Sequence, residues 1–340
     1  MTNSTEPGYD DRADLHRRLL GMNEHRNRYG EFLIGTQWYA TPAMFELIPE
    51  ALRLLLAADS TASELRSVAN PAKWLFLDVE ATGFAYGAGT LPFLVGLAWW
   101  DGGGMQIEQL FMRDPTEEYP VLLHLARRIR ERPVLATFNG KSFDWPLLST
   151  RFRMTQTIRP PEIGAHLDFL HPARQIWRLQ TGTARLSALE EQVLTDQELG
   201  FSRQGDVDSA QIPGVYFDYL SGNSTARLED VLRHNRMDLR GLAAISARIL
   251  SLLSLAGDGE TEKPTALELF GLSRIFQRRG ERTTALLLCD RAIELGLPEP
   301  IRETAEAELA KLRRHAQRLA KAQEKHGKKL RRSRVRNRCG

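Results

Sequence analysis

The sequence predicts an α/β fold in which a mixed sheet is flanked by helices, followed by a smaller unit made only of helices. Three observations support this. Short apolar runs of strand type follow one another from Lys73, helical and strand patterns then alternate to about residue 255, and only amphipathic helical patterns remain after residue 264. A chain of 340 residues is long enough for one sizeable domain and one smaller unit.

The composition is typical of a soluble globular protein, with 42% hydrophobic and 26% charged residues. No apolar run approaches the roughly 20 residues that a membrane helix needs, and the opening MTNSTEPGYDD is polar and acidic. We therefore expect a cytoplasmic protein without an export signal or a membrane partner. Cys289 and Cys339 belong to no disulfide or zinc pattern, so any metal ion is expected to have oxygen ligands.

Residues 1–70 are predicted to be an N-terminal extension of unknown role. They contain a possible strand or hairpin at EFLIGTQWY and an apolar helical pattern at PAMFELIPEALRLLLAA, and they end at SVANP. No motif in this extension indicates a chemistry.

Residues 71–255 are predicted to form the main domain. KWLFLDVEA, PFLVGLAWW and MQIEQLFM predict three strands, and the turn DGGG favours an antiparallel meander. A helix at EEYPVLLHLARRIRER, a strand at VLATF and a turn into a further helix at NGKSFDWPLLSTRF follow. In such sheets the ligand crevice lies outside the carboxyl ends of the strands.

Residues 264–323 predict amphipathic helices that resemble a tetratricopeptide-type hairpin. They either pack on the main domain or serve as a docking surface for a helicase or another protein. Residues 324–340 form a basic tail. From Lys311 onward there are 13 Lys or Arg and one acidic residue, so the net charge of +3 divides into +12 for this segment and −9 for the rest. Such a cluster is typical of nucleic-acid contact, or of a disordered solubilising tail.

Two acidic residues, Asp78 and Glu80, end the apolar run WLFLDVEATG. Because they are two residues apart on a strand they point to the same face. Like charges repel there, and a buried carboxylate is costly unless it is paired. A hard divalent cation would offset this cost. Taken alone, the pair is also typical of a solvated strand end.

Three further candidates follow along the chain. Asp144 lies near the start of a predicted helix, where it either stabilises the helix dipole or faces the crevice. His234 and Asp238, in HNRMD, are four residues apart on a predicted helix and therefore share one face. Considered singly, His234 is also typical of an ordinary helical residue and Asp238 of a surface charge.

In this order, the four acidic residues and the histidine resemble the DEDD superfamily of exonucleases, which have the ribonuclease H-like fold. The closer resemblance is to the bacterial YprB-type ribonuclease H-like family, from about Lys73 to Leu250. The segments that carry it are LDVEATGFAYGAGTLPFLVGL, ATFNGKSFDWPLL, IPGVYFDYLSG and LEDVLRHNRMDLRGL. Three residues separate His234 from Asp238, which is the spacing of the superfamily's tyrosine-bearing subgroup.

The resemblance implies a metal-dependent nuclease whose partner is DNA or RNA, with a 3′–5′ exonuclease in DNA repair or nucleic-acid processing as the preferred interpretation. It implies that the acidic residues, Asp78, Glu80, Asp144 and Asp238, hold two divalent ions, Mg²⁺ or Mn²⁺. It also implies that His234 accepts the proton of the attacking water. Helical repeats often follow the nuclease domain in this family, in agreement with the C-terminal helices.

Candidate substrate contacts have a weaker basis. Gly83, Gly87 and Gly89 either leave room for the substrate end or simply join two strands. Asn139 and Lys141 either meet the nucleotide or reflect ordinary Asn-Gly turn chemistry.

Four other polar residues are interpreted as structural. His166 and Asp168, in AHLDFL, lie near a predicted strand, and nothing in the sequence connects them with the crevice. Asp206 and Asp208, in GDVDS, are interpreted as loop acids.

Two other classes of function are weighed against the nuclease. The domain could hold nucleic acid or a helicase without cutting, although the complete acidic set argues against this. The C-terminal helices could instead make the protein a docking adaptor. Metal-dependent hydrolysis of single-stranded DNA, duplex DNA and RNA separates these classes, because neither a binding module nor an adaptor hydrolyses any of them.

Deleting the residues after about 325 is expected to weaken nucleic-acid binding and to flatten its dependence on salt, because fewer phosphates are neutralised. Binding isotherms at several salt concentrations measure both effects, and binding of Mn²⁺ should not change. Equal affinity of the two proteins at low salt would exclude the tail as a nucleic-acid contact.

Overall fold

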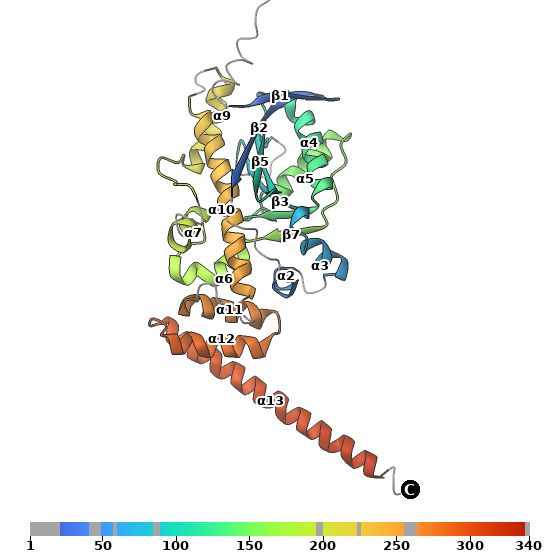
Figure 1. The fold of residues 1–340 in the computed structure, drawn as a ribbon, viewed down its shortest axis with the longest axis vertical. Helices are drawn as coiled ribbons and strands as arrows, with labels where there is room; N and C mark the ends of the chain where they lie inside the picture. The colour runs from blue at the N-terminus through green and yellow to red at the C-terminus, as the bar shows by residue number, and fades with distance from the viewer. Residues whose placement is uncertain are drawn as a thin grey trace, which may run out of the picture. The chain divides into compact units, whose positions relative to one another are not determined.

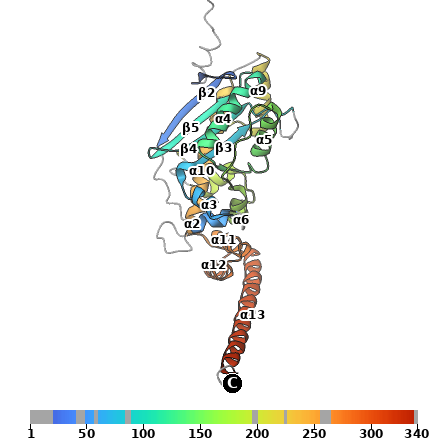
Figure 2. The ribbon, with the colours of Figure 1, turned by 90° about the vertical axis from the view of Figure 1, so that its right-hand side faces the viewer.

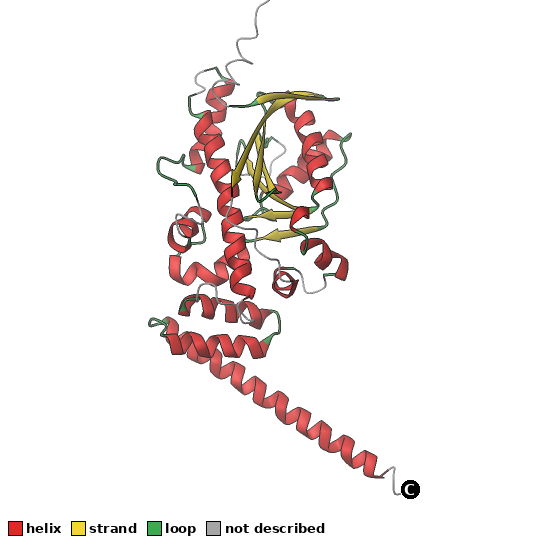
Figure 3. Cartoon of the chain, viewed as in Figure 1, coloured by secondary structure: helices red, strands yellow, loops and turns green. Residues whose placement is uncertain are grey.

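The computed structural model describes residues 21–40, 49–56, 60–83, 89–194, 200–222, 226–254 and 264–336. They divide into two compact units, of which the first comprises Met1–His171 and Arg185–Leu250 and the second Pro172–Ala184 and Ser251–Gly340. Helices and strands are shown in Figure 3. Within the described ranges, every helix falls short of the length or apolar character that a membrane span requires.

Strands of the first unit form one mixed sheet. They are β1 (Asn23–Asn27), β2 (Gly30–Ala40), β3 (Trp74–Glu80), β4 (Leu94–Asp101), β5 (Gly104–Phe111), β6 (Val134–Thr137) and β7 (Ala165–Asp168). Among the described residues the sheet has seven strands in the order β1-β2-β5-β4-β3-β6-β7, and Figure 2 shows β2, β5, β4 and β3 side by side. Pairing is parallel for β3 with β6 and for β6 with β7, and antiparallel elsewhere.

Helices of the first unit cover the sheet and connect its strands. The α-helices are α2 (Pro49–Leu55), α3 (Ala62–Val68), α4 (Glu118–Glu131), α5 (Asp144–Thr155), α7 (Leu186–Val193) and α9 (Ile212–Leu220). Short 3₁₀ turns are η1 (Pro71–Lys73), η2 (Pro115–Glu117) and η3 (Ser209–Gln211). The helices α6 (Leu170–Thr181) and α10 (Leu228–Ser254) begin in the first unit and end in the second.

The predicted meander is confirmed, and its turn has a local cause. Gly102 and Gly103 link β4 to β5 with φ of +56° and +86°, which is the geometry of a two-residue hairpin turn that glycine accepts without strain. The first four residues of β3 are fully buried, as expected for a central strand. The predicted α/β class with a mixed, helix-flanked sheet is therefore confirmed.

The N-terminal segment extends this sheet. The stretch EFLIGTQWY, predicted as a strand or a hairpin, lies wholly within the single strand β2, which pairs with β1 before it and with β5 from Leu33 to Ala40. Residues 23–40 thus belong to the same sheet as β3, although the sequence assigns them to an extension of unknown role. Of the helix predicted for residues 42–58, the described part is α2, and residues 41–48 and 57–59 lie outside the described residues.

The two faces of the sheet are covered by different helices, with α10 on one side and α4 on the other (Figure 1). Side chains confirm this arrangement, because Gln109 of β5 donates to the Leu232 carbonyl of α10, whereas its neighbour Glu108 contacts α4. The core is apolar and aromatic, and Phe93 stacks on Tyr216 of α9 with ring centroids 4.0 Å apart. Tyr216 also donates to the Met112 carbonyl, which fixes α9 on the sheet.

The second unit is helical. It contains the end of α6 together with α11 (Ala266–Arg278), α12 (Arg282–Leu295) and α13 (Ile301–Arg336). A Cβ on Gly271 of α11 would lie 2.5 Å from the Cα of Ile176, so the two helices cross closely there. Trp177 Nε1 donates to Glu268 Oε1 at 3.0 Å. The backbone of α13 continues through residue 324, where the sequence predicts the basic tail to begin.

Glu108 is a buried carboxylate with a complete set of partners. It is 2% exposed and accepts hydrogen bonds from His124 Nε2 at 2.8 Å and from Arg128 Nη2 at 2.6 Å. Burial acts to raise its pKa, but the bonds to His124 and Arg128 outweigh burial and hold the pKa at about 2, below the ordinary 4.5.

Acid should therefore remove a stabilising contribution from Glu108. Its pKa is lowered on folding, so the contribution is fully present above pH 4.5 and is lost as the pH falls toward 2. We expect the unfolding free energy of the wild type to exceed that of Glu108→Gln by a margin that shrinks by about 3 kcal/mol over this range. Urea unfolding at several pH values measures it. The control is Glu131→Gln, which removes a more exposed partner of Arg128. Its difference in unfolding free energy from the wild type should change by less than about 1 kcal/mol over the same pH range. A pH-independent difference for Glu108→Gln would contradict the prediction.

Candidate active site

Asp78 and Glu80 lie at the carboxyl end of β3, on the face of the sheet that α10 covers. Asp78 is opposite Gly96 of β4, and Gly96 is opposite Gln109 of β5, so the three positions form one row across the sheet. The parallel neighbour β6 ends at the same edge of the sheet, and Asn139 follows it. The expected crevice at this edge is thus where the predicted acids lie.

Asp144 is the first residue of α5 and is partly buried. The turn before it is held by Asp168 of β7, whose carboxylate accepts the backbone N–H groups of Asn139 at 2.8 Å and Lys141 at 3.0 Å. Asn139 has a φ of +71°, which asparagine tolerates better than most residues. Asp168 thus fixes the loop that leads to Asp144, and its charge also acts on that residue, so it is closer to the crevice than the sequence indicates. His166 bonds Thr137 at 2.9 Å.

His234 and Asp238 share one face of α10, as the spacing predicts. His234 Nε2 lies 3.6 Å from Asp238 Oδ2. Between them, Asn235 points its amide at the sheet and donates to Asp78 Oδ2 at 2.7 Å. The helix thus brings a histidine, an acid and an amide to the end of β3.

The approach of α10 to the sheet depends on Gly96. A Cβ at this position would lie 2.2 Å from Asn235 Oδ1, so a larger residue would displace the amide. Gln109 Nε2 donates to the same oxygen at 2.8 Å, and Arg236 Nη1 donates to Gln109 Oε1 at 3.1 Å. This chain of buried hydrogen bonds fixes the amide that contacts Asp78.

The acidic side chains raise one another's pKa. Burial raises the pKa of Asp78 well above its usual value, and the charges of Asp238, Glu80 and Asp144 add to this. Burial likewise raises the pKa of Glu80 to about 8, against the opposing charge of His234, and the pKa of Asp144 to about 7. Carboxylates from β3, α5 and α10 therefore lie within electrostatic range of one another.

The same negative charges stabilise the protonated, charged form of His234, whereas they destabilise the charged form of the acids. His234 is 7% exposed, and burial acts to lower its pKa. The charges of Asp238, Glu80 and Asp206 outweigh burial, so the pKa of His234 is raised.

One contact of His234 contradicts the sequence interpretation. Asp206 is not simply a loop acid, because it lies 2.9 Å from His234 Nδ1 through Oδ2. Arg203, which carries no motif in the sequence, pairs with both Asp206 and Asp238. Asp208 matches the prediction, since it is exposed and caps η3 by accepting from Ala210. No local pattern distinguishes Asp206 from Asp208, because both lie in an irregular segment.

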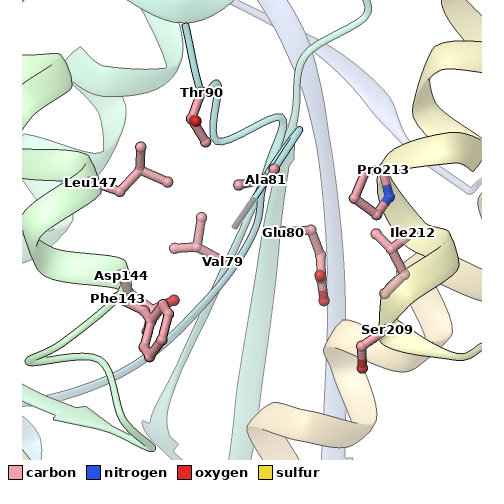
Figure 4. A pocket seen from close by; sticks show the side chains of 11 residues that line it. Val79, Glu80, Ala81, Thr90, Phe143, Asp144, Leu147, Ser209, Ile212 and Pro213 are labelled. Carbon is pink, nitrogen blue, oxygen red and sulfur yellow. The ribbon is translucent and has the colours of Figure 1, made fainter. Parts of the chain in front are cut away.

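A pocket of about 120 Å³ opens beside the acids. Phe143 and Asp144 lie on one side of it and Ile212, Pro213 and Ser209 on the other, with Glu80 between them (Figure 4). Its walls are otherwise mostly apolar.

The predicted substrate residues are distributed unevenly around this pocket. Gly83 lines it, whereas Gly89, Asn139 and Lys141 do not. Gly87 lies outside the described residues. Lys141 is exposed on the loop before Asp144, so its side chain is accessible from solvent.

The acidic group fits a hard divalent cation in donor type, because such ions prefer oxygen and would offset the mutual repulsion. The acids are instead engaged by the protein, Asp78 by Asn235 and Asp238 by Arg203. Among the residues that the structure describes, no three Asp, Glu, His or Cys side chains are arranged to hold a metal ion. The carboxylates would therefore have to turn away from these partners to bind one.

Comparison with known proteins covers the same region. A family model described as the RNase H superfamily matches residues 75–250, about half of the chain. The chain is also 29% identical over 249 residues to uncharacterized protein YprB of Bacillus subtilis (strain 168). That match covers 73% of this chain and 57% of YprB, so the chain spans a little over half the length of this relative.

Gly96→Ala should destabilise the fold by about 1 to 3 kcal/mol, because the new methyl group overpacks the Asn235 amide. Adding Asn235→Ala should remove most of that cost, so urea unfolding of the four proteins in the cycle should give a clear coupling energy. Gly214→Ala is the control, since a Cβ there would have no atom within 4 Å apart from its chain neighbours and the backbone of its own helix. A cost for Gly96→Ala that is the same with and without Asn235 would contradict this account.

Proposed function

The chain belongs to the RNase H superfamily, and this membership suggests a nuclease-type activity. We propose that the protein is a metal-dependent nuclease and, more specifically, a 3′–5′ exonuclease. The observation that supports this most strongly is the acidic group itself. Asp78, Glu80, Asp144 and Asp238 come from three separate elements, and burial and mutual charge raise the pKa of the first three. An arrangement that costs stability in this way is typical of a functional site.

The four acidic residues are the proposed ligands of two divalent ions, Mg²⁺ or Mn²⁺. Such ions, when bound, would supply Lewis-acid stabilisation of charge on a phosphodiester. His234 is the proposed acceptor of the proton from the attacking water, since its ring faces the acids through Nε2.

Substrate contacts are proposed for the loops on either side of the acids. The apolar walls of the pocket suit the sugar or base of a terminal nucleotide, and Gly83 leaves room beside it. Lys141 is exposed near Asp144 and suits a phosphate. Gly87, Gly89 and Asn139 are kept as proposed contacts on the sequence alone. The 3′ polarity rests on the resemblance to DEDD exonucleases, and DNA and RNA are both candidate substrates.

The second unit is proposed to bind partners. Leu287 and Leu295 of α12 are 62% and 56% exposed, which favours contact with a helicase or another protein. The tetratricopeptide-like character of these helices remains a prediction, as does the use of the basic end of α13 on nucleic acid.

Asp78→Asn should abolish metal-dependent degradation of an end-labelled oligonucleotide, with a loss of at least about 100-fold. Its thermal stability without metal should be equal or higher, because a buried carboxylate of raised pKa is replaced by a neutral amide of the same shape. Gel assays with Mn²⁺ and with a chelator, alongside thermal unfolding, measure both quantities.

Asp238→Asn should lose the same activity, whereas Asp218→Asn, on the exposed side of α9, is the matched control and should keep it. If either Asp78→Asn or Asp238→Asn degrades the oligonucleotide at the wild-type rate, the assignment of the acids is wrong.

A further inference from the structure

The segment before α9 supplies a neighbour to each ring nitrogen of His234. Asp206 contacts His234 Nδ1 through both carboxylate oxygens, at 3.0 and 2.9 Å. Ser209 Oγ lies 3.3 Å from Nε2 on the other edge of the ring. Both ring nitrogens therefore have defined neighbours, and these neighbours differ in kind.

Asp206 is surrounded by hydrogen-bond donors. Arg203 Nη1 donates to Oδ2 at 2.9 Å, and the backbone N–H of Val207 donates to Oδ1 at 2.9 Å. Burial acts to raise the pKa of Asp206, but the bonds and charges of Arg203 and His234 outweigh it and lower the pKa, so the side chain is a carboxylate. A carboxylate only accepts hydrogen bonds. His234 Nδ1 must therefore carry the hydrogen of this contact, which leaves Nε2 of the neutral ring as the acceptor.

Arg203 cannot easily leave this arrangement. Its Nε and Nη2 bond both oxygens of Glu190, at 2.5 and 2.8 Å, and Glu190 is only 1% exposed. A Cβ on Gly241 of α10 would lie 1.7 Å from Glu190 Oε1, so this glycine makes room for the pair. The bidentate contact holds the guanidinium, and the guanidinium holds Asp206.

We propose that Asp206, anchored by Arg203, is a positioning residue that keeps His234 in the tautomer with Nε2 free and facing the acidic site. The inference rests on the proposed function, in which His234 accepts a proton from the attacking water. Asp206 itself does not line the pocket, and it contacts His234 at Nδ1, the ring nitrogen that does not face Asp238. It therefore acts through the ring and not on the substrate.

The same contacts match the order of a Ser-His-Asp triad, with Ser209 as the possible nucleophile. Charge argues against that use. An acyl-transfer site must stabilise a developing oxyanion, whereas here Glu80 lines the pocket with Ser209 and Asp238 lies beside Nε2. The hydroxyl of Ser209 instead marks a position at which an oxygen can sit against Nε2.

The test is the tautomer of His234 in the full chain, measured by ¹⁵N NMR of histidine-labelled, metal-free protein at a pH where the ring is neutral. The His234 signals are assigned by their loss in His234→Gln. The wild type should show a protonated Nδ1 and an unprotonated Nε2. In Asp206→Asn the single amide oxygen should stay on Arg203, which turns the NH₂ group toward His234 and shifts the hydrogen to Nε2.

The same variants are then assayed for nuclease activity. Asp206→Asn should lower kcat by about 10- to 100-fold with little change in KM, by analogy with the loss of a hydrogen-bond partner behind a metal-binding histidine. Asp206→Glu, which retains an acceptor-only carboxylate, should keep the wild-type tautomer and recover part of kcat. Asp208→Asn is the matched control from the same segment, because asparagine also caps η3, and it should change neither quantity.

A wild type with its hydrogen on Nε2, or an Asp206→Asn protein with wild-type tautomer and kcat, would overturn the proposal. Failure of the proposed function is distinguishable, because it would leave all proteins without nuclease activity while the tautomer still reports on Asp206. A tautomer shift with unchanged kcat would show that Asp206 orients the ring without serving the reaction, and this would overturn its role as a positioning residue.

Discussion

The candidate site depends on one hydrogen bond, from Asn235 Nδ2 to Asp78 Oδ2 at 2.7 Å. It ties the register of α10 to the end of β3, and Gly96 is the position that lets the amide come so close. Because His234 and Asp238 belong to the same helix, this contact also decides where both of them lie relative to the strand acids. Gln109 supports the amide from behind, so the contact is part of a buried network and not an isolated bond.

Two carboxylates on opposite faces of the sheet show what distinguishes a site from a scaffold. Glu108 has His124 and Arg128 as partners, and its pKa is about 2. Glu80, on the face toward α10, lies among other acids, and its pKa is about 8. The fold supplies full compensation where the carboxylate only supports packing. It leaves the cost of burial only partly compensated where the binding of cations is proposed, which is how functional sites commonly differ from the rest of a protein.

Residues outside the acidic group determine how His234 is held beside it. Glu190 holds Arg203, Arg203 holds Asp206, and Asp206 holds the ring of His234. The pocket depends on a similar support, since stacking of Phe93 on Tyr216 fixes α9, whose first residues form one wall. Superfamily membership describes the sheet. The supporting contacts specify the geometry of the candidate site in this chain.

The sequence by itself determined the α/β class, the meander and the acids at the end of β3, because strand and helix periodicities and the glycine turn are local properties. The four-residue spacing of His234 and Asp238 determined their shared face in the same way. Only the tertiary structure decided the partners of these residues. Asp206, in an irregular segment, contacts a histidine 28 positions further along the chain. Asn235 contacts an aspartate that lies 157 positions before it. No local period encodes such contacts, because they depend on how α10 is packed against the sheet.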